Sequence, residues 1–253
     1  MKTLKMLSIA AVITTFVLAA TVSAGTVVAP AGFATTDATF AADSPLGDPD
    51  AGSRYQQIYD ASLFGQLPIV ISEIQFRAAS PENAFRPNSV SVSDSRISLS
   101  TTMVTSDPGA TAAGNFSAAF DANVGVDELI VFDGPLTLDR GGSNPSGPQP
   151  FSYGFALETP FIYNPQLGNL LLDVQVPTGA TVALGPGFGA LEDFDASTAS
   201  GDGTASVRGS VGSTVGAAGQ TGLVTQFTFQ PVPEPASALL LLTTSLAAIM
   251  RRR

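Results

Sequence analysis

Short segments in which apolar residues alternate with polar ones are the feature of this sequence that most restricts its fold. They recur between Arg54 and Phe229, are rich in Val, Ile, Thr and Phe, and are separated by turns containing Gly, Pro, Asp and Asn. A period of two residues places alternate side chains on opposite faces of a strand. No convincing amphipathic helix lies between these segments. The pattern therefore predicts an all-β fold, an antiparallel β-sandwich with jelly-roll-like packing.

Changes in the phase of the alternation predict where strands bend or end. Val70 and Ile74 are predicted to share one face of a strand, and the phase slip at Asp94–Ser95 predicts a β-bulge. Asp133–Gly134–Pro135 predicts a turn between two short strands, and Pro160 predicts the end of another strand.

Three stretches carry weaker patterns. Gly25–Ser53 is rich in Ala, Gly, Pro, Asp and Thr, and it is predicted to be a flexible lead-in to a sandwich domain spanning residues 54–230. Arg54–Gly65 begins with the alternation of a strand, but a short helix is an open alternative. Asp195–Gly222 is dominated by Gly, Ser, Thr and Ala and is either a flexible excursion or a pair of weak edge strands.

The first 24 residues have the pattern of a secretory signal peptide. Lys2 and Lys5 precede an apolar run from Met6 to Ala20, and Val22-Ser23-Ala24 places small residues where a signal peptidase reads them. Residues 1–24 are therefore predicted to be removed by cleavage between Ala24 and Gly25. A membrane anchor that stays is the alternative, although the apolar run is short for a spanning helix.

The domain that remains is acidic and lacks several reactive side chains. Between Gly25 and Pro231, six arginines stand against twenty carboxylates, which gives a formal charge of about −14. This charge disfavours nucleic acid as a partner and favours cations or neutral molecules. The chain has no His, no Cys and no Trp. Triads built on His, thiol catalysis, the usual zinc sites and disulfides are thereby excluded, and tyrosines are the remaining polar aromatic residues.

Oxygen-bearing side chains at alternate positions suggest a site for a hard cation. Asp121, Asn123 and Asp127 are spaced as in a loop that wraps calcium, although the segment lacks the Gly and Glu that an EF-hand requires. Asp and Asn side chains that cap turns are the alternative explanation. Apart from calcium, no cofactor is expected. A second oxygen-rich group with the same two interpretations consists of Glu192, Asp193 and Asp195.

Glu73 and Glu158 lie in strand patterns, as acidic residues of β-sandwich glycosidases often do. A pair of carboxylates is able to hydrolyse a glycosidic bond. A solvated strand face explains each residue equally, and no GxSxG, P-loop or Rossmann motif occurs. The expectation is a protein without catalytic residues, and a secreted carboxylate-dependent glycan hydrolase or lyase is the alternative.

The chain ends in an apolar run followed by three arginines. Ala236–Met250 contains no charged residue, and its helix would be about 22 Å long, against roughly 30 Å of bilayer hydrocarbon. The run is predicted to be a short transmembrane helix, with Arg251, Arg252 and Arg253 at its cytoplasmic end. A buried C-terminal helix is a poorer explanation because the run is apolar all round.

This tail resembles the PEP-CTERM sorting signal of Gram-negative bacteria. Val232 precedes Pro233-Glu234-Pro235, and the apolar run and basic terminus follow in order, behind an N-terminal signal peptide. The resemblance covers residues 231–253 and implies recognition by an exosortase, which would process the chain near the triplet. The domain also looks like β-rich modules that often precede this signal, through the stretches RYQQIYDASLF, EIQFR and TPFIYNPQLGNLLLDV.

The resemblance implies an exported protein with signal peptidase and exosortase as processing partners. The chain would be anchored transiently in the inner membrane through its C-terminal helix, facing the periplasm, before transfer to the cell surface or extracellular matrix. Proteins with this signal are associated with exopolysaccharide and biofilm formation. The expected role is therefore structural or adhesive, with a neutral exopolysaccharide as candidate ligand, bound through aromatic residues of the loops.

Overall fold

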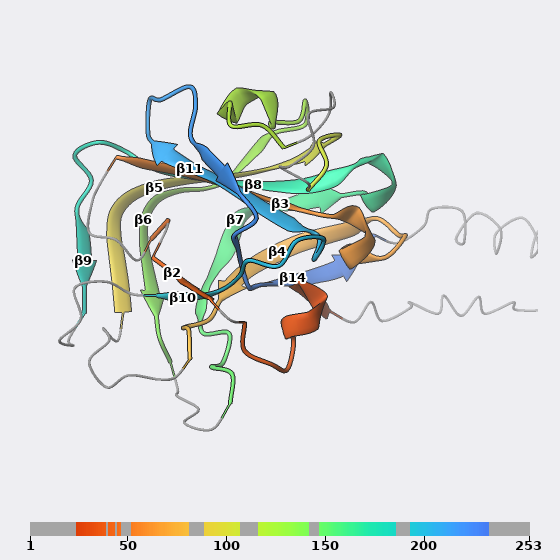
Figure 1. The fold of residues 1–253 in the computed structure, drawn as a ribbon, viewed down its shortest axis with the longest axis horizontal. Helices are drawn as coiled ribbons and strands as arrows, with labels where there is room; N and C mark the ends of the chain where they lie inside the picture. Colours follow the sequence, from red (N-terminus) through yellow and green to blue (C-terminus); the bar gives the residue numbers. More distant parts are fainter. Residues whose placement is uncertain are drawn as a thin grey trace, which may run out of the picture.

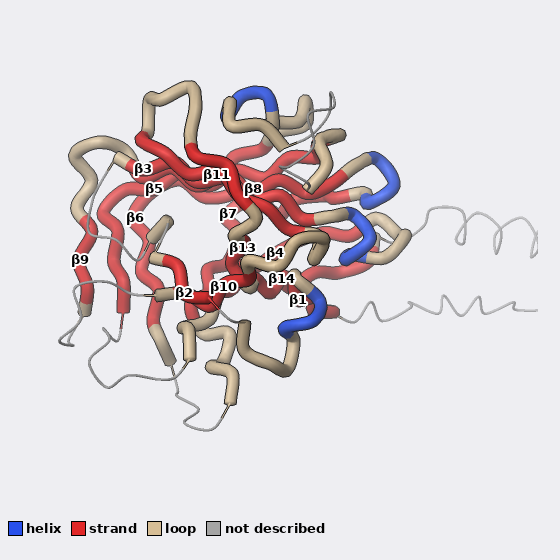
Figure 2. Tube along the Cα trace, viewed as in Figure 1, coloured by secondary structure: helices blue, strands red, loops and turns tan. Residues whose placement is uncertain are grey.

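The computed structural model describes residues 24–38, 40–43, 45–46, 52–80, 89–106, 116–141, 147–185 and 193–232. Within these ranges the regular structure is almost entirely β-strand, and all strand pairs are antiparallel (Figures 1 and 2). The helices are short 3-10 turns, and none in the described ranges has the length and apolar character needed to cross a membrane. The all-β prediction is confirmed.

The strands form two large sheets and one small sheet. The four-stranded sheet consists, in order, of β1 (Gly25–Ala29), β14 (Thr225–Pro231), β4 (Ile69–Phe76) and β7 (Tyr153–Tyr163). The largest sheet consists, in order, of β12 (Ala217–Gly219), β11 (Thr204–Ser210), β3 (Ser53–Tyr59), β8 (Asn169–Val176), β5 (Ser89–Thr102) and β6 (Leu129–Asp139), and β9 (Val182–Leu184) pairs with the start of β5. The small sheet consists, in order, of β13 (Gly222–Leu223), β10 (Phe194–Ser197) and β2 (Phe40–Ala42).

Four 3-10 turns lie in the described connections. They are η1 (Ala31–Phe33), η2 (Ala61–Phe64), η3 (Phe120–Ala122) and η4 (Pro165–Leu167). In η2 the carboxylate of Asp60 accepts a hydrogen bond from the Ser62 N–H at 2.9 Å, as an N-cap should. The segment Arg54–Gly65 therefore contains both open alternatives, a strand followed by a short helical turn.

One hydrophobic core lies between the two large sheets. Alternate residues of β8 (Leu170, Leu172, Val174 and Val176) are all buried in it, as the period-two pattern predicts. Aromatic side chains from both sheets meet there edge to face. The ring of Phe64 lies with its centroid 5.1 Å from that of Tyr163 and 5.3 Å from that of Phe227.

Strand β5 contains the predicted bulge. Its pairing with β6 shifts register between Val92 and Ser95. Val90 and Val92 before the shift and Ile97 and Leu99 after it are all buried in the same core. The extra residue corrects the phase of the alternation, so one long strand keeps a single apolar face.

The predicted turn at Asp133–Gly134–Pro135 is wrong, because β6 runs through it without interruption. Gly134 has a φ of 144° and lies opposite Ser95 of the β5 bulge, and its carbonyl accepts a hydrogen bond from the Ser95 hydroxyl at 3.0 Å. Strand β6 is an edge strand of its sheet, so Pro135 is tolerated at a position where a backbone N–H would need no partner.

Two expectations for the four-stranded sheet are also wrong. Strand β7 continues past Pro160, and β4 places Ile71 and Ile74, not Val70, in the core. Both differences have one cause, a shift of register in the pairing of β4 with β7. Ile71 pairs with Phe161, whereas Glu73, two residues later, pairs with Ala156, five residues earlier in β7. The residues of β7 between those two pairs form a bulge at the edge of the sheet, where proline does not break the hydrogen-bond ladder.

The flexible lead-in predicted for Gly25–Ser53 is wrong for two parts of it. Strand β1 pairs with β14 along its whole length, and β2 pairs with β10. Ala29 is fully buried and Val27 packs against the core. Backbone hydrogen bonds of a sheet need no bulky side chains, so a composition of small residues does not prevent pairing.

The low-complexity stretch Asp195–Gly222 forms strands, as one of its two interpretations predicts. Strand β11 lies between β3 and β12, and β12 ends the sheet. Ala205 and Val207 of β11 pack with Ile58 and Phe120 in a second hydrophobic cluster on the outer side of the largest sheet.

Candidate binding pocket

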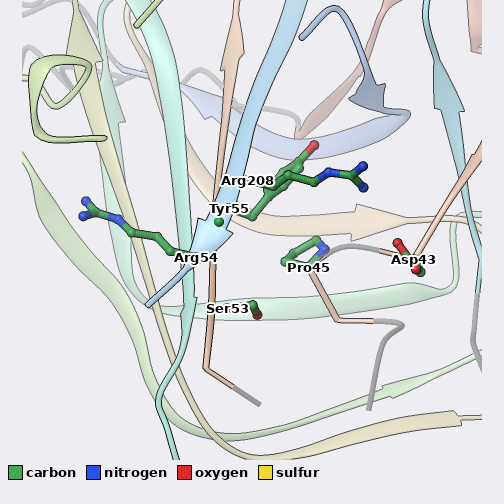
Figure 3. A pocket seen from close by; sticks show the side chains of 7 residues that line it. Asp43, Pro45, Ser53, Arg54, Tyr55 and Arg208 are labelled. Carbon is green, nitrogen blue, oxygen red and sulfur yellow. The ribbon is translucent and has the colours of Figure 1, made fainter. Parts of the chain in front are cut away.

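A polar pocket of about 240 Å³ opens where β3 begins (Figure 3). It is smaller than the roughly 300–1,000 Å³ typical of sites for drug-sized ligands, and it suits a small polar group such as one sugar ring. The residues that line it are Asp43, Pro45, Ser53, Arg54, Tyr55, Arg208 and Gly209.

Arg208 is the side chain that most distinguishes this pocket. It lies directly opposite Tyr55 in the pairing of β11 with β3, and it is exposed. Figure 3 shows it extending to the side where Asp43 lies, whereas Arg54 extends the opposite way. Among the described carboxylates, none forms an ion pair with Arg208. Its guanidinium is therefore available to a ligand, with a carboxylate on the same side of the pocket.

The side chain of Gln57 holds Tyr55, which lines the pocket. Its Oε1 accepts hydrogen bonds from the Tyr55 hydroxyl at 2.5 Å and from the Leu223 N–H at 2.8 Å, and its Nε2 donates to the Leu223 carbonyl at 2.9 Å. The amide thus pairs with β13 as a neighbouring strand would. Burial raises the pKa of Tyr55, so its hydroxyl stays protonated and keeps this hydrogen bond.

Arg54 lines the pocket with its backbone and stem, because its charged end is engaged on the other face of the sheet. The guanidinium lies 2.7 Å from the carboxylate of Asp173, 3.2 Å from that of Asp121, and 4.8 Å above the ring centroid of Phe120. Gln56 donates a further hydrogen bond to Asp173 at 2.7 Å. This network, buried at Asp173 and Gln56 and exposed at Asp121, holds η3 on the outer face of the sheet.

The three predicted calcium ligands are each engaged in structural contacts. Asp121 pairs with Arg54, and Asp127 accepts a hydrogen bond from the Thr101 N–H at 2.7 Å. Asn123 is fully buried, and its amide bonds to Gln56 and to the backbone of Ser117. In the described part of the chain, no group of three or more His, Cys, Asp or Glu side chains is placed to hold a metal ion. Calcium binding stays a prediction.

Two residues of the second oxygen-rich group, Asp193 and Asp195, have structural contacts. Asp195 forms a fully buried ion pair with Arg77, with 2.6 Å between nitrogen and oxygen. Its carboxylate also accepts a hydrogen bond from the Ala38 N–H at 3.1 Å. Burial raises the pKa of Asp195, and the hydrogen bond and charge of Arg77 partly offset this. Asp193 contributes its carbonyl to the Ala79 N–H, and Glu192 lies outside the described residues.

Strand pairing brings Glu73 and Glu158 to neighbouring strands. Glu73 of β4 lies opposite Ala156 of β7, and Glu158 follows two residues later, at the start of the β7 bulge. Both side chains face away from the core. Glu158 is exposed, and Glu73 accepts a hydrogen bond from the Thr228 hydroxyl at 3.1 Å. The sequence could not establish this proximity, which depends on strand register.

The four tyrosines do not supply the loop aromatics expected for glycan binding, and that expectation stays a prediction. Tyr55, Tyr59, Tyr153 and Tyr163 are all buried, with at most 4% of their surface exposed. They lie in strands and pack in the core, so none presents a ring for stacking on a sugar. The pocket instead offers polar contacts.

The two predicted processing sites flank the strands. Ala24 is exposed and Gly25 begins β1, while the N–H of Val232 donates to the Pro68 carbonyl at 3.0 Å just after β14. Pro233, Glu234, Pro235, the apolar run 236–250 and Arg251, Arg252 and Arg253 lie outside the described residues, as do residues 1–23.

Sequence reasoning missed Arg208 as a binding residue. The available signal was its isolation, since it is the one basic residue in the low-complexity stretch Asp195–Gly222. Its proximity to the residues that follow β2 depends on the fold. No protein family model, curated protein or solved structure matches the chain. The assignment of function therefore depends on this geometry and on the sequence signals at the two ends.

Proposed function

We propose that this chain is an exported surface or extracellular-matrix protein, processed at both ends, with a structural or adhesive role. The observation that carries the proposal is the coincidence of the strands with the two sequence signals. The first described strand begins at Gly25, directly after the predicted cleavage site, and the last described strand ends at Pro231, two residues before the Pro-Glu-Pro triplet. Cleavage at both sites would remove none of the described strands.

We also assign the domain to the jelly-roll type of β-sandwich. The support is strand order. The series β1-β14-β4-β7 and β3-β8-β5-β6 are those of an eight-stranded chain wound as two Greek keys into facing sheets. Strands β2 and β9–β13 are additions to that framework. Lectin domains are among the proteins that use it, an analogy that agrees with an adhesive role.

Mass spectrometry of the exported protein tests the processing. We expect an N-terminus at Gly25 and a C-terminus near the triplet, because a signal peptidase and an exosortase would each have cut. An exported protein that still contains Arg253 contradicts processing at the C-terminal end. One that retains Met1 contradicts the signal peptide.

The adhesive role would be carried by the Arg208 pocket. The guanidinium of Arg208 and the Ser53 hydroxyl provide donors and an acceptor for the hydroxyl groups of a glycan. A neutral, hydroxyl-rich sugar therefore fits the pocket better than a polyanion, which the acidic domain would repel.

Binding to a polysaccharide array tests this assignment, with Arg208→Ala as the variant. We expect the variant to lose binding to the glycans that the parent retains. Arg96→Ala is the matched control, since Arg96 is half-exposed and pairs at the surface with Asp133 at 3.2 Å. Equal binding by the Arg208→Ala and Arg96→Ala variants would remove the pocket from the proposal.

A glycan hydrolase or lyase is the second candidate, and the placement of Glu73 and Glu158 on neighbouring strands favours it. Two carboxylates at the separation of adjacent strands are within the range used by glycosidases. Both residues lie on the outward side of the sheet, away from the Arg208 pocket. A reducing-sugar assay with Glu73→Gln and Glu158→Gln tests it, and no product from any polymer would eliminate this candidate.

A further inference from the structure

Exposed apolar side chains gather at the end of the molecule where β14 ends. Four loop residues there have a large fraction of their surface exposed: Leu67 with 57%, Leu167 with 64%, Met103 with 80% and Val126 with 109%. They come from four different connections, so no single loop explains the concentration. We name these four residues the apolar rim.

A series of contacts joins the rim to the end of β14. The Val232 N–H donates to the Pro68 carbonyl, beside Leu67, and the Gln166 amide donates to the Gln66 carbonyl at 2.9 Å, which joins the loops of Leu67 and Leu167. Gly168 lies against the carbonyl of Thr102, next to Met103, so closely that a Cβ would clash there.

Val126, the fourth rim residue, is joined to the others by a similar close contact. Gly125 lies so close to the Thr101 carbonyl that only glycine fits, and Val126 follows it. The rim is therefore continuous with the point where the chain leaves its last strand. Four residues after Val232 the uncharged run Ala236–Met250 begins.

Carboxylates also lie at this end, and each has a protein partner. Asp127, next to Val126, accepts from the Thr101 N–H, and Glu128 accepts from the Ser98 hydroxyl at 2.8 Å. Asp60 caps η2. The apolar rim therefore lies beside exposed carboxylates whose hydrogen-bonding capacity is partly satisfied within the protein.

We propose that the apolar rim contacts the bilayer, at the boundary between headgroups and acyl chains, while residues 236–250 are embedded. Apolar side chains flanking a membrane-inserted segment gain free energy by entering this boundary. An acidic domain would be repelled by anionic lipid, so the occupant is a neutral or zwitterionic surface. The inference rests on the proposed function, because it requires the tail to enter the membrane first.

The absence of cysteine from the chain allows a direct test on the full-length protein. Single variants Val126→Cys and Leu167→Cys carry a small fluorophore, and the labelled protein is reconstituted into phosphatidylcholine vesicles that contain nitroxide-labelled lipid. Leu241→Cys reports insertion of the tail. Val215→Cys is the matched control, because Val215 is an apolar residue with 56% exposure that follows β11 at the other end of the sheet.

We expect quenching at Leu241, quenching of similar extent at Val126 and Leu167, and little loss of fluorescence at Val215. Quenching at Leu241 without quenching at the two rim positions overturns the inference and leaves the proposed function standing. No quenching at Leu241 overturns both. Equal quenching at Val215 overturns the inference too, since the domain would then have no preferred orientation. Leu67→Cys and Met103→Cys replace either rim variant that does not fold.

Discussion

Replacing Gln57 with leucine should remove the connection between β3 and the small sheet. The Leu223 N–H would lose its acceptor in a fully buried position, whereas the Leu223 carbonyl keeps a hydrogen bond from the Thr225 hydroxyl at 3.0 Å. The Tyr55 hydroxyl is able to turn to Ser206. One orphaned donor costs about 1–3 kcal/mol and one lost bond about 1 kcal/mol, so we expect a loss of about 2–4 kcal/mol in the free energy of unfolding.

Urea unfolding followed by circular dichroism measures this loss, with Gln166→Leu as the matched control. Gln166 is exposed and donates one hydrogen bond, so its replacement should change the free energy of unfolding by less than about 0.5 kcal/mol. Hydrogen exchange at the Leu223 amide should accelerate in the Gln57 variant alone. Equal stability of the two variants, or unchanged protection of Leu223, would refute the role of Gln57 as a strand partner.

Three further predictions follow from contacts of single residues. Gly125→Ala should prevent the loop from packing on Thr101, which thermal melting would show as a lower midpoint; an unchanged midpoint would contradict the close approach. Because the pKa of Asp195 is raised by burial, the parent should lose stability relative to Asp195→Asn as pH rises above about 3.9, the pKa of an unfolded aspartate. Urea unfolding at a series of pH values from 3 to 7 measures this. A difference in the free energy of unfolding that does not change with pH would contradict it. If Asp121 and Asp127 bind calcium as predicted, chelation should lower the melting midpoint; an unchanged midpoint would remove them from the site.

The sequence predicted best those strands whose two faces differ in polarity. The bulge in β5 was predictable because Val92 and Ile97 cannot share a face without an extra residue. The same reasoning failed at the edges. Pro135 and Pro160 lie in strands that end their sheets, where a missing N–H is tolerated, and β1 is held by its backbone rather than by its composition.

The candidate sites were less predictable, because each depends on residues distant in the sequence. Arg208 opposes Tyr55 through the pairing of β11 with β3, a separation of more than half the chain. Glu73 and Glu158 become neighbours through β4 and β7. The spacing of Asp121, Asn123 and Asp127 predicts a loop for calcium, and this stays a prediction. The contacts of Asp121 with Arg54 and of Asn123 with Gln56 depend on the position of β3, which no local pattern reveals.

The pocket and the apolar rim lie at opposite ends of the same strand. Strand β3 enters at Ser53 beside the pocket and ends at Tyr59, directly before η2 and the loop of Leu67. Seven residues of strand span roughly 20 Å. A chain embedded through residues 236–250 with its rim on the lipid would therefore hold Arg208 away from the membrane, open to the periplasm. A domain attached by the other end would bury the pocket against the headgroups, so the direction in which β14 leaves the sheet would keep the pocket accessible before the chain is cut and transferred.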